Sequence, residues 1–242
     1  MIKLIHGEIY RILHKKSMYI YFLSLAAGYF LLAFIRSGGF KEESVVSDAI
    51  IFFNFFPAIA GGFLFSAIYT DDLNSKNLIS LVGFGVNKTK IVAAKLILTI
   101  IFGTVIFGLA PVFHCAVYAV LGTAATSGMM ITIYAVSLKY LLMTVAFAAL
   151  SGTAVYGLQR TTFAVVLYIL LAFNVIGSMI GVALTTFAPD AVIYLMSGIT
   201  DRIFAGMING GSVTLPVIEY IVYVIIAAVA SVLVFYKKEM EF

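Results

Sequence analysis

The amino-acid sequence predicts an all-α integral membrane protein built as a bundle of six transmembrane helices. Hydrophobic residues make up 63% of the 242 residues and charged residues only 11%, against about 45–50% and about 25% in an average globular protein. The mean hydropathy is +1.12. A soluble chain of this composition would have too little polar surface to cover its exterior. The long continuous apolar runs also differ from the short alternating segments of a β-barrel.

The first 16 residues predict an amphipathic helix that lies in the membrane interface. Apolar residues recur there at helical spacings, namely Ile2, Ile5, Ile9, Ile12 and Leu13. Lys3, Glu8, Arg11 and Lys15 occupy the other positions, so one face is apolar and the other is charged. The alternative is a solvated basic tail that only fixes the topology.

Six apolar runs follow, and each has roughly the 20 residues needed to cross a hydrocarbon core of about 30 Å. They cover residues 18–35, 49–69, 95–121, 139–156, 161–187 and 217–236. Pro111 is expected to kink the third run. With six spans, 11 of the 15 Lys and Arg residues fall on one side of the membrane, and that side includes both termini. An even number of spans is needed for both termini to lie on the same side. The positive-inside rule then places both termini in the cytoplasm.

The connections between the spans are unequal. Residues 156–161 predict a tight cytoplasmic turn, and residues 122–137 predict a small-residue outer link. Residues 70–94 form a polar cytoplasmic segment with a helical pattern of its own. Residues 188–215 are too apolar for a solvated outer loop, so we expect two short outer-leaflet or re-entrant helices there. The whole chain, residues 1–242, is expected to be one transmembrane domain.

The sequence lacks the residues that catalysis or metal binding in a membrane would require. A single cysteine, Cys115, and three scattered histidines exclude a cysteine-rich metal site and argue against any metal centre. No serine lies in a nucleophile-elbow setting, so no catalytic residue is predicted. His114 is interpreted as a packed, hydrogen-bonded residue, with a proton relay or a metal ligand as the alternative. The net charge of +4 follows the membrane topology and does not indicate a nucleic-acid partner.

The segment between the second and third spans carries the most specific pattern. Thr70, Asp71 or Asp72 is expected to cap the N-terminus of a short helix. Gly83 and Gly85 are expected to end that helix. A phosphate loop is absent, because the lysine after these glycines is not directly preceded by glycine. The apolar face of the helix is formed by Leu78, Ile79, Leu81 and Val82.

This order of residues resembles the permease subunits of ABC-2 type exporters, in particular small six-span bacterial peptide exporters. Asp72 matches the acidic position of the family motif, residues 78–81 match its leucines, and residues 86–88 match its turn. Lys95 matches the lysine that opens the third span, whereas Lys76 and Asn77 replace the usual Gly-Thr. The motif covers about 25 residues, and the six-span layout extends the resemblance over the whole chain.

The resemblance implies that residues 70–94 form a coupling helix that docks on a separate ATPase subunit. The coupling interface would comprise Asp71, Asp72, Lys76, Leu78, Ile79, Leu81, Val82 and Lys88. ATP and magnesium would bind the ATPase subunit, so this chain would hold no cofactor and would not be an enzyme. A second copy or a homologous permease would pair with it in the lipid bilayer of a bacterial plasma membrane. Gly210 and Gly211, in the outer segment, would form part of an outer gate.

The expected function is therefore ATP-driven export of amphipathic peptides or hydrophobic compounds. Two alternatives from other classes stay open at this point. An ATP-independent channel or secondary carrier would conduct without a partner ATPase, and an intramembrane enzyme would need a buried serine or His114 for turnover.

Overall fold

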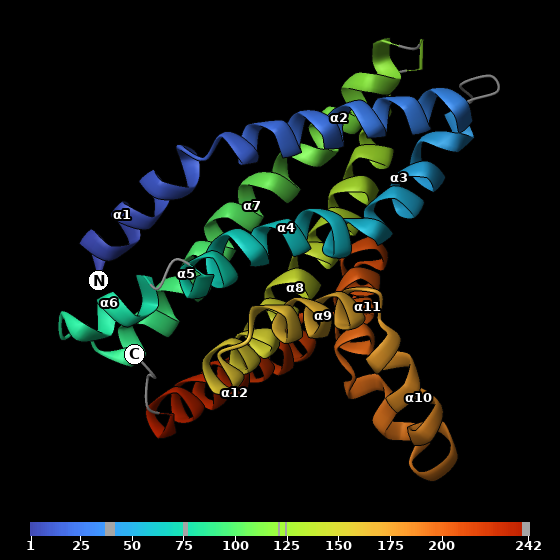
Figure 1. The fold of residues 1–242 in the computed structure, drawn as a ribbon. Coiled ribbons are helices and arrows are strands. Elements are labelled where there is room, and N and C mark those ends of the chain that lie inside the picture. Colours follow the sequence, from blue (N-terminus) through green and yellow to red (C-terminus); the bar gives the residue numbers. More distant parts are fainter. Residues whose placement is uncertain (37–41, 75–76, 121, 124, 239–242) are drawn as a thin grey trace.

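The computed structural model describes residues 1–36, 42–74, 77–120, 122–123 and 125–238, and every regular element in these ranges is a helix (Figure 1). The elements are α1 (Ile2–Leu13), α2 (Lys16–Arg36), α3 (Glu42–Phe56), η1 (Pro57–Gly61), α4 (Gly62–Phe65), η2 (Ser66–Thr70), α5 (Asp71–Asn74), α6 (Asn77–Gly83), α7 (Lys88–Val120), α8 (Ser127–Leu158), α9 (Thr161–Ala172), α10 (Val175–Phe187), η3 (Pro189–Tyr194), α11 (Met196–Asn209) and α12 (Thr214–Lys237).

Four helices in the described ranges are long and apolar enough to span a membrane. They are Val45–Leu73, which runs from α3 into α5, together with α7, α8 and α12. The bent pair α9 and α10 makes a fifth if the two are one span, and the apolar stretch found in α2, Met18–Leu31, is shorter. The all-α, multi-pass membrane architecture is confirmed, whereas the expected count of six spans is not.

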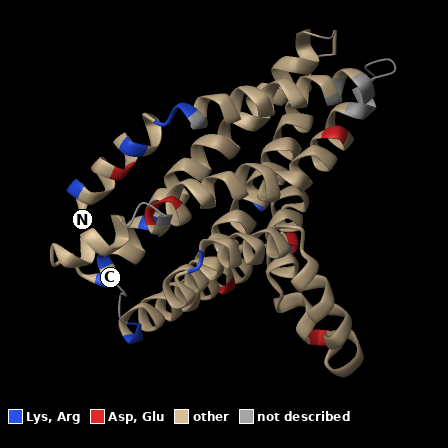
Figure 2. Cartoon of the chain, in the orientation of Figure 1, with Lys and Arg blue, Asp and Glu red and all other residues tan. Residues whose placement is uncertain are grey.

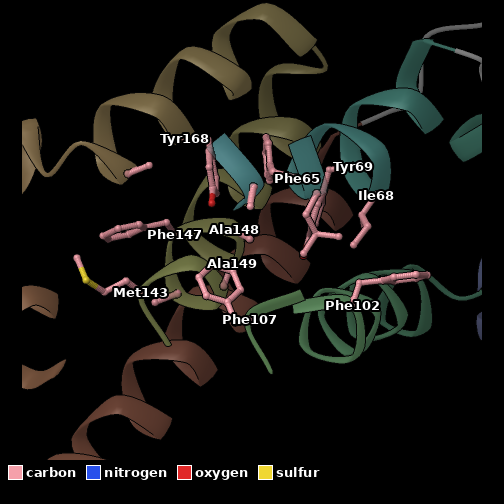
Figure 3. Packing of buried hydrophobic residues seen from close by; sticks show 14 of the residues in the cluster. Phe65, Ile68, Tyr69, Phe102, Phe107, Met143, Phe147, Ala148, Ala149 and Tyr168 are labelled. Carbon is pink, nitrogen blue, oxygen red and sulfur yellow. The ribbon is translucent and has the colours of Figure 1, made fainter. Parts of the chain in front are cut away.

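Helix α8 forms the centre of the bundle, where α7, α9, α11 and α12 all pack against it. Its buried residues are mostly small, among them Ala146, Ala148 and Ala149. Small side chains let neighbouring helices approach closely, which is the main source of packing energy in a membrane bundle. Large aromatic side chains from the surrounding helices fill the space around this face, as Figure 3 shows for Phe107 and Tyr168.

Two predicted boundaries are wrong because the helices begin earlier than hydropathy suggests. The third span was expected from residue 95, but α7 starts at Lys88. The predicted outer link 122–137 is helical from Ser127 onward, where the side chain of Thr126 accepts a hydrogen bond from the Met129 amide at 3.5 Å. Capping by a threonine oxygen allows a helix to begin outside its apolar stretch. The tight turn is confirmed, since only Gln159 and Arg160 separate α8 from α9.

The expected fifth span, 161–187, is broken. Asn174 adopts a left-handed backbone conformation with φ of 56°, and α9 and α10 meet there at 56°. Asparagine is one of the few residues that adopt this conformation at low cost. Figure 1 shows α10 projecting from the bundle, and none of its residues is buried within the chain.

The helix from Val45 to Leu73 contains two π-helical turns, η1 and η2. Tyr168 of α9 donates its hydroxyl hydrogen to the carbonyl oxygen of Pro57 at 2.9 Å, and the Tyr21 hydroxyl of α2 donates to the carbonyl of Ile59. Widened turns leave carbonyl oxygens poorly paired within the helix. The two tyrosines satisfy such carbonyls and tie η1 to helices on either side.

Gly61 is required for this contact, and its neighbour Gly62 provides a matched control. A Cβ atom at Gly61 would overlap the Tyr168 hydroxyl and lie 2.8 Å from the Thr144 methyl group, whereas one at Gly62 would have its nearest neighbour at 3.8 Å. We expect Gly61→Ala to lower the stability by about 1–3 kcal/mol through overpacking. Gly62→Ala should have little effect. Thermal unfolding of the purified variants in detergent measures the difference, and equal unfolding temperatures would contradict this packing.

Candidate functional site

The candidate site lies where α1 packs on the ends of α5 and α7, at the end of the bundle that carries the N-terminus and the last described residues. We call this the terminal end. Figure 2 shows lysines and arginines gathered there, around α1 and α6. The side of α1 that faces the bundle includes Glu8 and Ile12, which are both buried. The expected division into an apolar inner face and a charged outer face is therefore wrong for Glu8.

Lys95 of α7 lies at the centre of this contact. Its ammonium group donates a hydrogen bond to Glu8 Oε2 at 3.0 Å and another to Asp72 Oδ2. Glu8, Asp72 and Lys95 are exposed to only 4%, 1% and 2%. Charges buried to this degree are stable only when each is paired and hydrogen-bonded.

Arg11 pairs with the same two carboxylates. Its guanidinium nitrogens lie 2.8 Å from Asp72 Oδ1 and 2.6 Å from Glu8 Oε2. Two cations and two anions thus alternate, and the formal charge of the group is zero. We call Glu8, Arg11, Asp72 and Lys95 the buried ion cluster. It joins three elements, because its members come from α1, α5 and α7.

A second ion pair lies next to the cluster. The ammonium group of Lys15, just after α1, pairs with the carboxylate of Asp71, the residue before Asp72. Both side chains are about one-third exposed, so this pair contributes less to stability than the buried ones. Consecutive aspartates of α5 therefore bind the N-terminal segment at two points.

The expected capping role of Thr70, Asp71 or Asp72 is wrong. The helix that starts with α3 continues through these residues to Leu73, so no new helix begins at this point. Thr70 donates its hydroxyl hydrogen to the Ser66 carbonyl of the preceding turn. Asp72 is used as a buried counter-ion, and it also accepts a 3.4 Å hydrogen bond from the Asn77 side-chain amide.

The apolar residues of α6 face the bundle more than they face water. Leu78 is buried in the main hydrophobic cluster, and Leu81 and Val82 pack against that cluster. Leu78 is therefore not available to a docking partner, while Ile79, Leu81 and Val82 are each half-buried. The exposed apolar side chain of this segment is Phe84, at 86% exposure.

The turn after α6 holds Phe84 at its tip. The Val86 amide donates to the Leu81 carbonyl at 3.1 Å, and the Gly85 amide donates to the Val82 carbonyl at 2.9 Å. Gly85 has φ of 77°. This is a Schellman motif, in which a left-handed glycine ends the helix and satisfies its last carbonyls. The expectation that the helix ends at Gly83 and Gly85 is confirmed.

The remaining predicted interface residues are not brought together. Lys88 binds the C-terminal end of α12, with its ammonium group 2.8 Å from the Phe235 carbonyl oxygen and 3.2 Å from that of Lys238. A cation at this position complements the free carbonyls and the negative dipole end of the helix. Lys76 lies outside the described residues.

The predicted outer gate lies away from this site, between α11 and α12. Gly210 ends α11 with φ of 69°, while Gly211 does not have a positive φ. Arg202 of α11 pairs with Glu219 of α12, and Asp201 lies 2.5 Å from Lys139 of α8. Ion pairs thus attach α11 to two helices. Lys139, expected at the start of a span, lies inside α8.

His114 belongs to a buried hydrogen-bonded group near the start of α3. Its Nδ1 atom contacts the Tyr29 hydroxyl, and its Nε2 atom lies 2.9 Å from the Val45 carbonyl oxygen. The nearby Tyr118 hydroxyl donates to Asp48 at 2.5 Å. Over the described part of the chain, no three His, Cys, Asp or Glu residues are placed to hold a metal ion.

Sequence reasoning identified Asp72 and Lys95 but missed Glu8 and Arg11 as their partners. The two missed residues lie three apart on a predicted helix, a spacing that allows an ion pair on one face. Nothing in that spacing indicates which face turns inward.

We compared the chain with family models, with curated proteins and with solved structures, and none of the three comparisons found a match.

The buried ion cluster can be tested by removing its central charge. We expect Lys95→Met to destabilise the protein by about 3–5 kcal/mol, because two carboxylates would be left with one cation in a low-dielectric site. Lys90→Met, on the exposed first turn of the same helix, should stay within about 0.5 kcal/mol of the wild type. Thermal unfolding in detergent compares the two, and similar unfolding temperatures would show that the cluster does not form.

Proposed function

We propose that this chain is the membrane-spanning subunit of an ABC-2 type exporter and works with a separate ATPase subunit. The observation that supports this most directly is the contact between Asp72 and Lys95. These residues lie at the acidic position and the final lysine of the segment that resembles the family motif. Their contact fastens the segment between them, which includes α6, to the start of a transmembrane helix.

In this proposal the tip of α6 is the part that touches the ATPase subunit. Leu78 and Asp72 are buried, so their role is to hold α6 in position. Phe84 is the apolar side chain that a partner could bury, and exposed apolar groups of this kind often mark contact sites. Gly85 and the Schellman hydrogen bonds hold the turn in a fixed shape.

The buried ion cluster would transmit the movement of this tip to the bundle. A displacement of α6 reaches α5 through Asn77 and Asp72, and then α1 and α7 through Arg11 and Lys95. Because each charge needs its partner at this depth, the three elements should move as one unit. ATP binding at the partner could then shift two paired bundles between packings.

The transport pathway would be apolar, which suits amphipathic peptides or hydrophobic compounds. Two paired chains would enclose it, and α2 together with the bent pair α9 and α10 would complete six spans in each. The segment with η3 and α11 would lie at the outer end, where Gly210 permits the sharp turn between α11 and α12. Both termini would face the cytoplasm of a bacterial cell.

The docking role of Phe84 gives a direct test. Phe84→Asp should weaken binding of the ATPase subunit by about 10-fold to 100-fold, since burial of one such side chain is worth about 1.5–3 kcal/mol. Leu158→Asp is the control, because Leu158 is also exposed and lies at the turn between α8 and α9. Co-purification of the ATPase subunit from cells that express both chains measures the loss. Full retention of the partner by the Phe84 variant would contradict the docking role.

The proposed orientation can be tested by cysteine labelling in a Cys115→Ala background. Asn209→Cys, at the exposed end of α11, should react with a membrane-impermeant maleimide in intact cells. Lys90→Cys, at the exposed start of α7, should react only after the cells are permeabilised. Labelling of position 90 from outside would refute the orientation and, with it, docking of α6 on a cytoplasmic ATPase.

A further inference from the structure

An apolar cavity of about 340 Å³ lies between α2, α3 and α7. This volume is at the lower end of the range for small-molecule sites. Its lining is hydrophobic and includes Met18 and Phe22 of α2, Phe56 of α3, and Phe102 and Ile106 of α7. The buried ion cluster contributes no lining residue. The cavity therefore offers no ionic partner to a ligand and suits a hydrocarbon chain.

The cavity extends along the helices for about the thickness of one membrane leaflet. Its lining runs from Met18 to Tyr29 on α2 and from Phe102 to Phe113 on α7. Eleven residue steps of 1.5 Å correspond to about 17 Å in each case, and half of the hydrocarbon core is about 15 Å. Both helices run away from the terminal end (Figure 1), so the cavity is elongated in the direction of an acyl chain.

Tyr29 closes the end of the cavity that lies farthest from the terminal end. It is buried, and its ring packs edge-on against Phe52 at 4.1 Å and Phe113 at 5.5 Å between centroids. Its hydroxyl points to His114, so the polar atom is used elsewhere and the ring is left as an apolar wall. A chain that enters from the terminal end would stop at this ring.

The other end of the cavity lies at the junction of α1 and α2, where Leu13 and Tyr19 contribute to the lining. Positive charge dominates the segment before it, since Glu8 is the only acidic residue among the first 16. Glu8 is neutralised inside the buried ion cluster, while Lys3 and Lys16 are exposed. Exposed basic residues beside a membrane surface attract anionic lipid headgroups.

We propose that this cavity binds one acyl chain of an anionic glycerophospholipid from the leaflet at the terminal end. The acyl chain lies between α2 and α7 with its end against Tyr29, and the phosphate lies near Lys16. The lipid would complete the packing of α2 against the bundle. The site depends on the protein lying in a membrane and does not depend on an ATPase partner.

The first experiment uses the wild-type chain reconstituted in lipid nanodiscs with a trace of phosphatidylglycerol that carries a photoactivatable acyl chain. After illumination, peptide mass spectrometry should find the label concentrated on the lining residues of α2 and α7, above the level on the lipid-facing side of α12. An excess of unlabelled phosphatidylglycerol should suppress this labelling more than phosphatidylcholine does. Uniform labelling of all exposed helix faces would overturn the site, and equal suppression by the two lipids would overturn its preference for an anionic headgroup.

The second experiment fills the cavity. Ala26→Trp and Ala110→Trp replace small lining residues of α2 and α7, and each should reduce labelling of the cavity about tenfold, since several buried methylene groups lose their contacts. Val229→Trp on an exposed position of α12 is the matched control. Unchanged labelling in folded Trp variants would overturn the proposal. If neither variant folds, the competition measured on the wild-type chain decides the question.

Discussion

The structure depends on the neutralisation of one buried lysine. Lys95 lies where α7 enters the bundle, and removal of its charge from water would be prohibitive without Glu8 and Asp72 beside it. These two partners come from helices that are distant in sequence, so the charge can be satisfied only when α1 and α5 have both reached α7. The need to replace the water around Lys95 with these two carboxylates therefore specifies how α1, α5 and α7 come together at the terminal end. Apolar packing alone would permit many similar arrangements in lipid.

The same requirement explains why the first helix differs from an ordinary interfacial helix. Arg11 and Glu8 turn toward the bundle, while Ile2 and Tyr10 are largely exposed. In a helix held only by the membrane surface, the apolar residues would face the lipid and the charges would face water. The apolar residues Ile5, Ile9 and Ile12 pack toward the same side, so apolar and ionic contacts together fix the rotation of α1 about its axis.

Much of the fold could be predicted from hydropathy, and the exceptions have local causes. The apolar runs that form parts of α7, α8 and α12 could be predicted, because a run of about 20 apolar residues has few alternatives to a membrane helix. The start of α8 was set too late, since residues 129–136 are themselves mostly apolar and Thr126 caps the helix just before them. The break at Asn174 depends on one backbone conformation, which hydropathy does not encode. For the site, Asp72 and Lys95 were found in sequence, but the inward rotation of Glu8 and Leu78 is a tertiary effect.

The two π-helical turns in the helix from Val45 to Leu73 change the direction, around the helix axis, in which the residues after them point. A π turn takes up one residue more than an α turn does, and one residue corresponds to about 100° around the axis. Asp72 follows both η1 and η2. In a regular α-helix of the same length its carboxylate would emerge on a different side, away from Lys95. The two π turns, η1 and η2, therefore help to determine the direction in which the buried carboxylate points.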